Sequence, residues 1–164
     1  LGPWPIEALC AVDRLVFAAT GNGANGLPSK AGAPTQIALI DPDDGRIVWR
    51  GEIPGVAAAH HPLWDPASRS VHFAAGGVLR RLDLAARVLV PAEGAPKLSG
   101  AGVALHRGKI HFADGAELKA LDPATGKVAL VATLPAKIAR IAAGPRGLYA
   151  ACGIDLYEIR EETS

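Results

Sequence analysis

The motif Asp-Pro-x-x-Gly occurs twice in the chain, each time between two short apolar runs. The two copies and a weaker copy between them are residues 39–49 (LIDPDDGRIVW), 121–130 (LDPATGKVAL) and 82–90 (LDLAARVLV). Their leading aspartates, Asp41, Asp83 and Asp122, are spaced 42 and 39 residues apart. A period of about 40 residues, built of short apolar runs separated by turns, indicates a repeated unit made of several strands.

A second series of positions has the same period. One aromatic residue lies inside a short apolar run in each repeat: Phe17, Phe73, Phe112 and Tyr149. The first interval is longer because it contains residues 21–34, an insertion rich in Gly, Asn and Pro. Repeats of about 40 residues are typical of β-propeller blades, including WD40-like repeats, in which each blade is a four-stranded antiparallel sheet. We expect each aromatic residue on the second strand of its blade, packed between neighbouring sheets.

The predicted fold class is therefore all-β, a β-propeller of four consecutive four-stranded antiparallel blades forming one segment over residues 1–164. The blades are predicted at residues 6–54, 55–94, 97–135 and 137–160. The expected strands are 6–12, 15–19, 36–40, 46–51, 56–63, 70–75, 78–84, 87–90, 102–105, 109–113, 117–121, 127–133, 138–142, 147–151 and 155–160. The last blade lacks its outer strand, and the N-terminus offers no strand to replace it. We therefore expect a partial propeller, completed by a second copy, a protein partner or a further segment; a self-contained four-bladed disc is the alternative.

Composition excludes several classes of function. The formal net charge of +1 argues against nucleic acid as the main partner. No apolar run approaches the roughly 20 residues that a membrane-spanning helix needs. Cys10 and Cys152, the two cysteines, each lie in an apolar run, which predicts buried free thiols rather than a disulfide. Free thiols slightly favour a cytoplasmic over a periplasmic location, and the compartment otherwise stays open.

The turn copies also suggest a family. LDPATGKV and IDPDDGRIVW resemble the repeat of quinoprotein-like (PQQ-type) β-propellers, in which a strand, a D-P-x-T-G-K turn and a strand ending in Trp recur. Trp49 occupies that Trp position in the first blade, whereas the other blades have aliphatic residues there. Residues 62–73 (PLWDPASRSVHF) resemble the first hairpin of a blade in lactonase-type and YVTN-type propellers.

The resemblance implies one cofactor site. Residues 20–23 (TGNG) and the insertion after them are similar to a stretch of quinoprotein alcohol dehydrogenases, where the Asn is a calcium ligand beside the quinone. The resemblance implies Asn22 as a Ca²⁺ ligand and Asp65 as the catalytic aspartate. An ordinary turn at Asn22 is the alternative, and it is favoured because a calcium ion needs several further oxygen ligands.

Three other residues are candidates for ligand binding. His60 and His61 fall on the first strand of the second blade, which in a propeller lines the central channel. Adjacent residues of a regular strand point to opposite faces, so we expect only one of the two to face any one site. Arg140, on the first strand of the fourth blade, suits a carboxylate or a phosphate, with an inter-blade salt bridge as the alternative. His72 and His111 recur at one position of successive blades, which indicates a structural role.

These features leave two functional hypotheses. The first is a non-catalytic module, without a cofactor, that binds a protein or a small ligand through its loop face. The insertion would supply the contact loop, with Asn22, Asn25 and Lys30 as its contact residues. The alternative is a fragment of a PQQ- and calcium-dependent quinoprotein dehydrogenase. The sequence contains no phosphate-binding Gly-x-x-x-x-Gly-Lys-Ser/Thr loop, no Gly-x-Ser-x-Gly elbow and no zinc-type Cys/His cluster.

Overall fold

The computed structural model describes residues 5–21, 33–90, 93–98 and 102–160. These residues form fifteen β-strands and no helix. Within those ranges, nothing forms a helix of the length and apolarity that crossing a bilayer requires. The chain divides into two compact units, unit 1 at residues 1–93 and unit 2 at residues 94–164. Each unit contains two antiparallel sheets.

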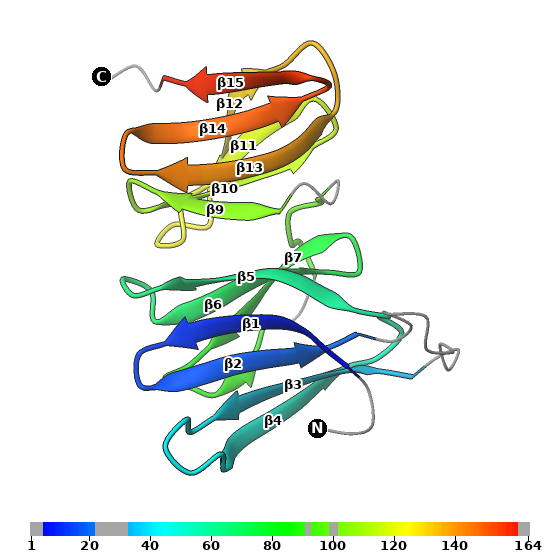
Figure 1. Ribbon diagram of the computed structural model, residues 1–164, viewed down its shortest axis with the longest axis vertical. Coiled ribbons are helices and arrows are strands. Elements are labelled where there is room, and N and C mark those ends of the chain that lie inside the picture. The colour runs from blue at the N-terminus through cyan, green and yellow to red at the C-terminus, as the bar shows by residue number, and fades with distance from the viewer. Residues whose placement is uncertain (1–4, 22–32, 91–92, 99–101, 161–164) are drawn as a thin grey trace. The chain divides into compact units, whose positions relative to one another are not determined.

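Unit 1 consists of two four-stranded sheets whose strands follow one another in chain order (Figure 1). The first sheet contains β1 (Ile6–Val12), β2 (Leu15–Thr20), β3 (Thr35–Ile40) and β4 (Ile47–Ile53). The second contains β5 (Ala59–Asp65), β6 (Ser70–Ala75), β7 (Val78–Asp83) and β8 (Val88–Leu89). The inner strands β1 and β5 contact one another. This meander order in each sheet is the topology of propeller blades.

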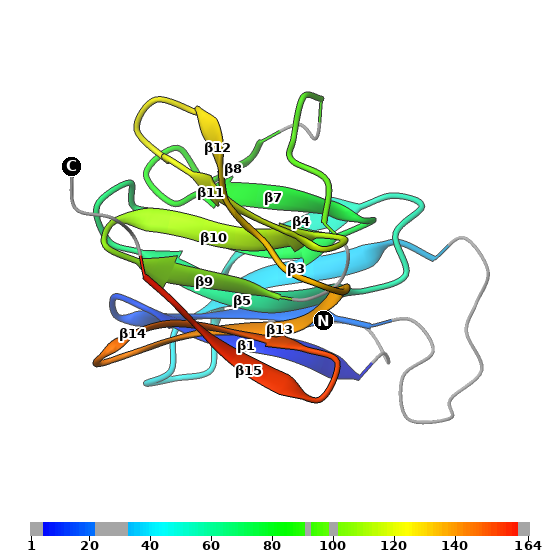
Figure 2. The same cartoon turned by 90° about the horizontal axis from the view of Figure 1, so that it is seen from above.

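Unit 2 repeats the arrangement with one strand fewer. Its first sheet contains β9 (Val103–His106), β10 (Lys109–Asp114), β11 (Glu117–Leu121) and β12 (Val128–Thr133). Its second contains β13 (Ile138–Gly144), β14 (Gly147–Cys152) and β15 (Asp155–Ile159). Strand β13 lies along β9 and β10 (Figures 1 and 2). In the described residues the fourth blade thus has three strands, as the sequence predicted.

The repeated aromatic residues lie in the second strand of each sheet. Phe17, Phe73 and Phe112 are fully buried, and Tyr149 is half-buried. The rings of Phe17 on β2 and Phe73 on β6 lie 5.2 Å apart between centroids, tilted by 39°. This contact joins the two sheets of unit 1, and such a tilted pair adds about 0.5–1.5 kcal/mol beyond the area that it buries. The prediction of aromatic packing between neighbouring blades is confirmed in unit 1.

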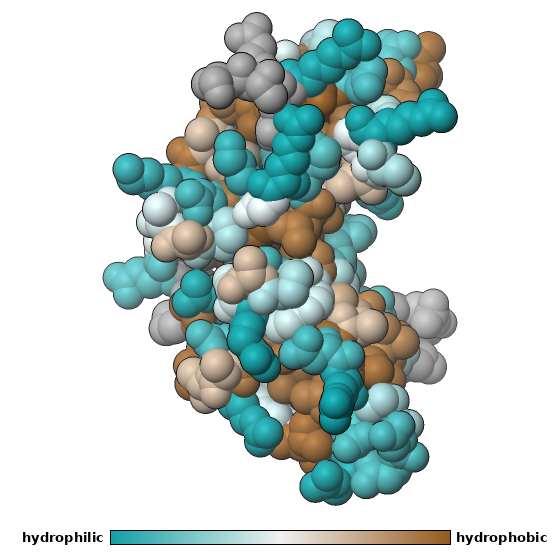
Figure 3. Space-filling model, turned by 90° about the vertical axis from the view of Figure 1, so that its left-hand side faces the viewer, coloured by the Kyte–Doolittle hydropathy of each residue, from teal (hydrophilic) through white to brown (hydrophobic). Residues whose placement is uncertain are grey.

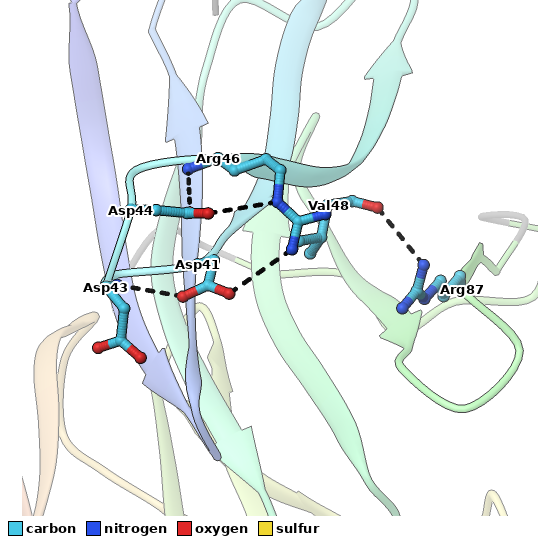
Figure 4. Close-up of polar contacts among 6 residues, drawn as sticks. All are labelled: Asp41, Asp43, Asp44, Arg46, Val48 and Arg87. Atoms are coloured by element: carbon cyan, nitrogen blue, oxygen red, sulfur yellow. Dashed lines mark hydrogen bonds and ion pairs between the residues drawn. The ribbon is translucent and has the colours of Figure 1, made fainter.

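The repeated aspartates form turns. The Oδ1 atoms of Asp41, Asp83 and Asp122 each accept hydrogen bonds from backbone N–H groups two or three residues further on. The donors are Asp43, Ala86, Ala124 and Thr125. Hydrogen bonds from the backbone of Ala124 and Thr125 lower the pKa of Asp122. Gly45 and Gly126 both have φ of 72°, the left-handed conformation that closes each Asp-Pro turn. Figure 4 shows the Asp43 N–H donating to Asp41 in the first of these turns.

One predicted strand began three residues too early. The first strand of the second blade, expected at residues 56–63, is β5 at Ala59–Asp65. Gly55 turns the chain with φ of 68°, and the carbonyl oxygen of Val56 accepts a 2.7 Å hydrogen bond from Thr35 Oγ1. Residues 55–58 therefore serve as a connection, and the ladder begins only at Ala59.

Candidate functional site

His60 and His61 lie on a β-bulge at the start of β5. The pairing of β5 with β6 shifts register between His60 and Leu63, and His61 has φ of 51°. Pro62 follows and has no N–H to donate to the ladder. Because the bulge interrupts the alternation of side chains, the two imidazole centroids lie 6.1 Å apart, and both residues are exposed. The opposite-face arrangement expected for a regular strand does not apply here.

Glu7 on β1 faces this bulge. It lies at a register shift of its own, because Ile6 pairs with Thr20 and Ala8 pairs with Ala19. Its Oε2 atom is 3.7 Å from Nδ1 of His60. The Glu7 side chain is 16% exposed and that of His60 is 53% exposed. Glu7 Oε2 is buried and accepts no hydrogen bond from the described residues, so the carboxylate has acceptor capacity to spare.

Gly21 explains why the Glu7 carboxylate fits. A Cβ atom at position 21 would collide with the carboxyl group of Glu7. The Gly21 N–H donates to the Pro5 carbonyl at 3.0 Å, and Gly21 forms an isolated bridge with Ala58 just before β5. The chain enters the insertion at this point. Glu7, His60 and the base of the insertion therefore lie at the same end of the blades. We call this end of unit 1 the insertion end.

Two buried threonines hold the base of the insertion. Thr20 Oγ1, at the end of β2, accepts a hydrogen bond from the Gln36 N–H at 3.0 Å. Thr35 Oγ1, at the start of β3, donates to the Val56 carbonyl. Both threonines are at most 1% exposed. The strands on either side of the insertion are therefore anchored to one another and to the connection that leads into β5.

The predicted contact residues of the insertion, Asn22, Asn25 and Lys30, lie outside the described residues, and their roles stay predictions. Arg140 belongs to unit 2, where it is exposed on β13 beside a register shift. Its NH1 group donates to the Ala139 carbonyl at 2.9 Å. In the part of the chain that the structure describes, no carboxylate pairs with Arg140.

Asp65 is engaged in a hairpin turn. It is 1% exposed, its Oδ1 accepts from the Ala67 N–H at 3.1 Å, and its Oδ2 accepts from Ser68 Oγ. Across residues 5–21, 33–90, 93–98 and 102–160, no three His, Cys, Asp or Glu side chains gather as metal ligands. A carboxylate committed to its own turn does not fit the role of the catalytic aspartate at a calcium–quinone centre.

The two repeated histidines are buried. His72 on β6 is 2% exposed, and burial lowers its pKa to about 4, while Asp65 opposes and Arg81 reinforces that shift. His111 on β10 is fully buried, with its ring edge-on to that of His106 at 6.0 Å. Both positions thus belong to the interior of their sheets, as a structural role requires.

Comparison with solved structures identifies the architecture. The Neurospora crassa Pan2 WD40 domain matches with a TM-score of 0.63 and 12% identity, over 91% of this chain and 44% of that one. The β-propeller domain of Myceliophteria thermophila Cps50 (Swd1) matches with a TM-score of 0.63 and 15% identity, over 96% of this chain and 55% of that one. The chain is built of β-propeller blades. It spans about half the length of these two propellers.

A third match comes from an enzyme. Kuenenia stuttgartiensis hydrazine synthase aligns with a TM-score of 0.64 and 12% identity, over 92% of this chain and 56% of that one. No protein-family model and no curated protein matches the chain. Identities this low establish the propeller fold alone, and neither the quinoprotein type nor an activity follows from them.

Sequence reasoning missed Glu7 and Gly21 as part of the site. A local signal exists for each: Glu7 is the one charged residue in the otherwise apolar run of β1, and Gly21 directly precedes Asn22. Their meeting with His60 depends on the packing of β1 against β5, which no local pattern reveals.

Proposed function

We propose that this chain is a non-catalytic β-propeller module that binds a protein partner through the insertion end of unit 1. The observation that carries the proposal is the exposed, bulged pair His60 and His61 beside the rigid base of the insertion. Buried threonines hold that base, and the insertion would supply the contact loop. This division between a rigid sheet and a binding loop is how propellers and other β folds build recognition sites.

The exposure of the imidazoles favours a protein over a small ligand. A small ligand gains affinity by being enclosed in a cavity, whereas an open surface buries enough area only against a large partner. His60 would supply a polar contact beside the Glu7 carboxylate, whose Oε2 atom lies 3.7 Å from the Nδ1 atom of His60. Asn22, Asn25 and Lys30 would add hydrogen-bonding groups from the insertion. The matches to the Pan2 WD40 domain and the Cps50 β-propeller domain support a binding module. The match to hydrazine synthase, an enzyme, is the reason that fold likeness alone does not decide the function.

Strand β15 offers a place where a protein partner or a second copy would extend the propeller. Among the described residues it pairs with β14 on one side only. Leu156 on this strand is 71% exposed. An unpaired strand edge with apolar side chains is a template for pairing with another chain.

The alternative, part of a PQQ- and calcium-dependent dehydrogenase, would use Asn22 and Asp65. The Asp65 carboxylate is turned into its own hairpin, and nothing else on the described residues favours this alternative.

Site-specific photo-crosslinking tests the proposal. A benzophenone amino acid is placed at Ala57, an exposed position beside the Gly21–Ala58 bridge, and in a separate variant at Asp43, exposed on a turn at the other end of the blades. Both variants leave His60 and His61 in place. After irradiation in a lysate of the source cells, we expect a discrete cross-linked protein from the Ala57 variant and none from the Asp43 variant.

Two further comparisons complete the test. Deleting residues 22–32 from the Ala57 variant should abolish the cross-link, while circular dichroism verifies that the sheets remain. A cross-link from Asp43 alone, or one that survives the deletion, would contradict binding at the insertion end. Light scattering then distinguishes a foreign partner from a second copy, because a second copy gives a mass near 33.6 kDa, twice that of the 16.8 kDa chain.

A further inference from the structure

A groove lies in unit 1 at the end of the blades opposite the insertion. Three turns meet there: Asp13–Arg14 between β1 and β2, residues 66–69 between β5 and β6, and residues 84–87 between β7 and β8. The groove has a volume of about 540 Å³ and runs between the first and second blades. We call this end of unit 1 the hairpin end.

The groove is lined by more positive than negative charge. Arg14, Arg69 and Arg87 all line it, against one carboxylate, Asp13. Asp13 Oδ2 lies 3.4 Å from the Arg69 NH2 group, and these side chains are 52% and 64% exposed, so water screens the pair. At the described positions no carboxylate pairs with Arg14 or Arg87. The lining therefore carries an excess of two positive charges.

Arg87 is held toward the first blade. Its NH1 group donates to the Val48 carbonyl of β4 at 3.4 Å (Figure 4). A guanidinium group has five N–H donors in a planar fork, so this one bond leaves others available. The planar fork matches the two oxygens of a carboxylate or a phosphate.

The backbone holds these side chains at the corners of their turns. Asp13, Arg69 and Arg87 have φ of 50°, 49° and 53°. They are three of the five non-glycine residues with left-handed backbone in the described ranges. Such conformations are uncommon for bulky side chains and cluster at sites of function. Glycine would satisfy all three turns more easily, so arginine at positions 69 and 87 points to a use for the side chain.

The floor of the groove is apolar. The residues that line it are Val12, Leu15, Leu39 and Leu84. Val12 and Leu39 are at most 1% exposed, whereas Leu15 and Leu84 are half-buried and offer apolar surface to a ligand. Figure 3 faces the hairpin end and shows hydrophilic side chains flanking patches of apolar surface on unit 1. A basic rim over an apolar floor suits a ligand that has an anionic head and an apolar body.

From these observations we infer that the groove binds a small organic anion, with a carboxylate or phosphate head held by Arg14 and Arg87 and an apolar body on Leu15 and Leu84. Its volume lies within the roughly 300–1,000 Å³ typical of small-molecule sites. The groove is separate from the insertion end. A module whose partner binds at the insertion end would therefore also bind a small ligand at the opposite end of the same blades.

Isothermal titration calorimetry with two probe anions tests this inference. The probes are phenyl phosphate and 4-phenylbutyrate, and the comparison compounds are inorganic phosphate and benzyl alcohol. We expect one-to-one binding of at least one probe, about tenfold tighter than either comparison compound. Inorganic phosphate lacks the apolar body, and benzyl alcohol lacks the anionic head. Backbone amide NMR shifts should change at residues 12–15 and 84–87.

Variants at the turn corners test the residues. Arg87→Gly and Arg69→Gly remove a guanidinium group while keeping the left-handed turn easy to adopt, and Arg14→Ala removes the third. We expect Arg14→Ala and Arg87→Gly to weaken probe binding by about tenfold or more, as the loss of a charged hydrogen-bond donor does. Arg46→Ala is the matched control: it removes the same charge from unit 1 but does not line the groove, and its effect should stay within about twofold.

Three results would overturn the inference. One is a lack of binding by both probes, and another is binding that Arg14→Ala and Arg87→Gly leave unchanged although circular dichroism matches the wild type. The third is tighter one-to-one binding of a hexaglutamate peptide than of either probe, which would make an acidic segment of a protein the ligand.

Discussion

His72 makes the stability of unit 1 depend on pH. Its imidazole lies in the middle of β6, 2% exposed, and its Nε2 atom has no hydrogen-bond partner among the described residues. Burial lowers its pKa from the ordinary 6.5 to about 4; the Asp65 carboxylate opposes this shift and Arg81 reinforces it. The folded chain therefore keeps His72 neutral at pH values where the unfolded chain protonates it.

The size of the effect follows from linkage. Between pH 6.5 and 4 the unfolded state binds more protons than the folded state, so the free energy of unfolding falls as pH falls through this window. With pKa values of 6.5 and about 4, the loss is about 2 kcal/mol by pH 5 and about 3 kcal/mol by pH 4. Below about pH 4 this residue causes little further loss.

Urea unfolding followed by tryptophan fluorescence measures the effect on unit 1. Trp49 and Trp64 lie in unit 1, and residues 94–164 contain no tryptophan. The variant His72→Gln has no titrating imidazole, so its stability between pH 7 and pH 5 should fall by about 2 kcal/mol less than that of the wild type. His111→Gln, at the matching position of unit 2, should leave the loss of unit 1 stability between pH 7 and pH 5 at its wild-type value. Parallel pH profiles for wild type and His72→Gln would refute the buried, neutral imidazole.

Three further predictions concern packing. Gly21→Ala should lower the free energy of unfolding by about 1–3 kcal/mol, because its Cβ would collide with the Glu7 carboxyl group. Adding Glu7→Ala to the same chain should relieve most of this loss. An equal cost of Gly21→Ala with and without Glu7→Ala would contradict that contact. Phe73→Ala should cost about 3–5 kcal/mol by urea unfolding, since it empties the space beside Phe17, and a loss below about 1 kcal/mol would contradict its place in the core. The thiols should react with Ellman's reagent much more slowly in the native chain than in urea. Burial raises the pKa of Cys10, and Cys152 is 3% exposed with its Sγ hydrogen-bonded to the backbone of Ala136. Similar rates in the native and unfolded chains would contradict this prediction.

The repeat period was enough to predict the strands and turns. Each of the fifteen predicted strands overlaps an observed one, and the Asp41 and Asp122 turns form as expected, because propensity and turn chemistry are local. The start of β5 was wrong because the hydrogen bond from Thr35 to Val56 joins residues far apart in sequence.

The sites were only partly predictable for the same reason. His60 and His61 were recognised as an unusual pair, but their bulge and the approach of Glu7 depend on packing between two blades. Arg14 and Arg87 are 73 residues apart and come together only when three turns meet. The Asp-Pro turns were predictable from local residue preferences, yet a turn sequence says nothing about where the Asp65 carboxylate points.

Hydrogen–deuterium exchange of the chain with and without its cross-linked partner tests the central claim most directly. If the insertion end binds the partner, the complex should show slower exchange at residues 57–61 and at Thr20 and Gly21. The turn at residues 84–87 should exchange at the same rate in both states. Protection confined to residues 84–87 and the other turns of the hairpin end would contradict the account.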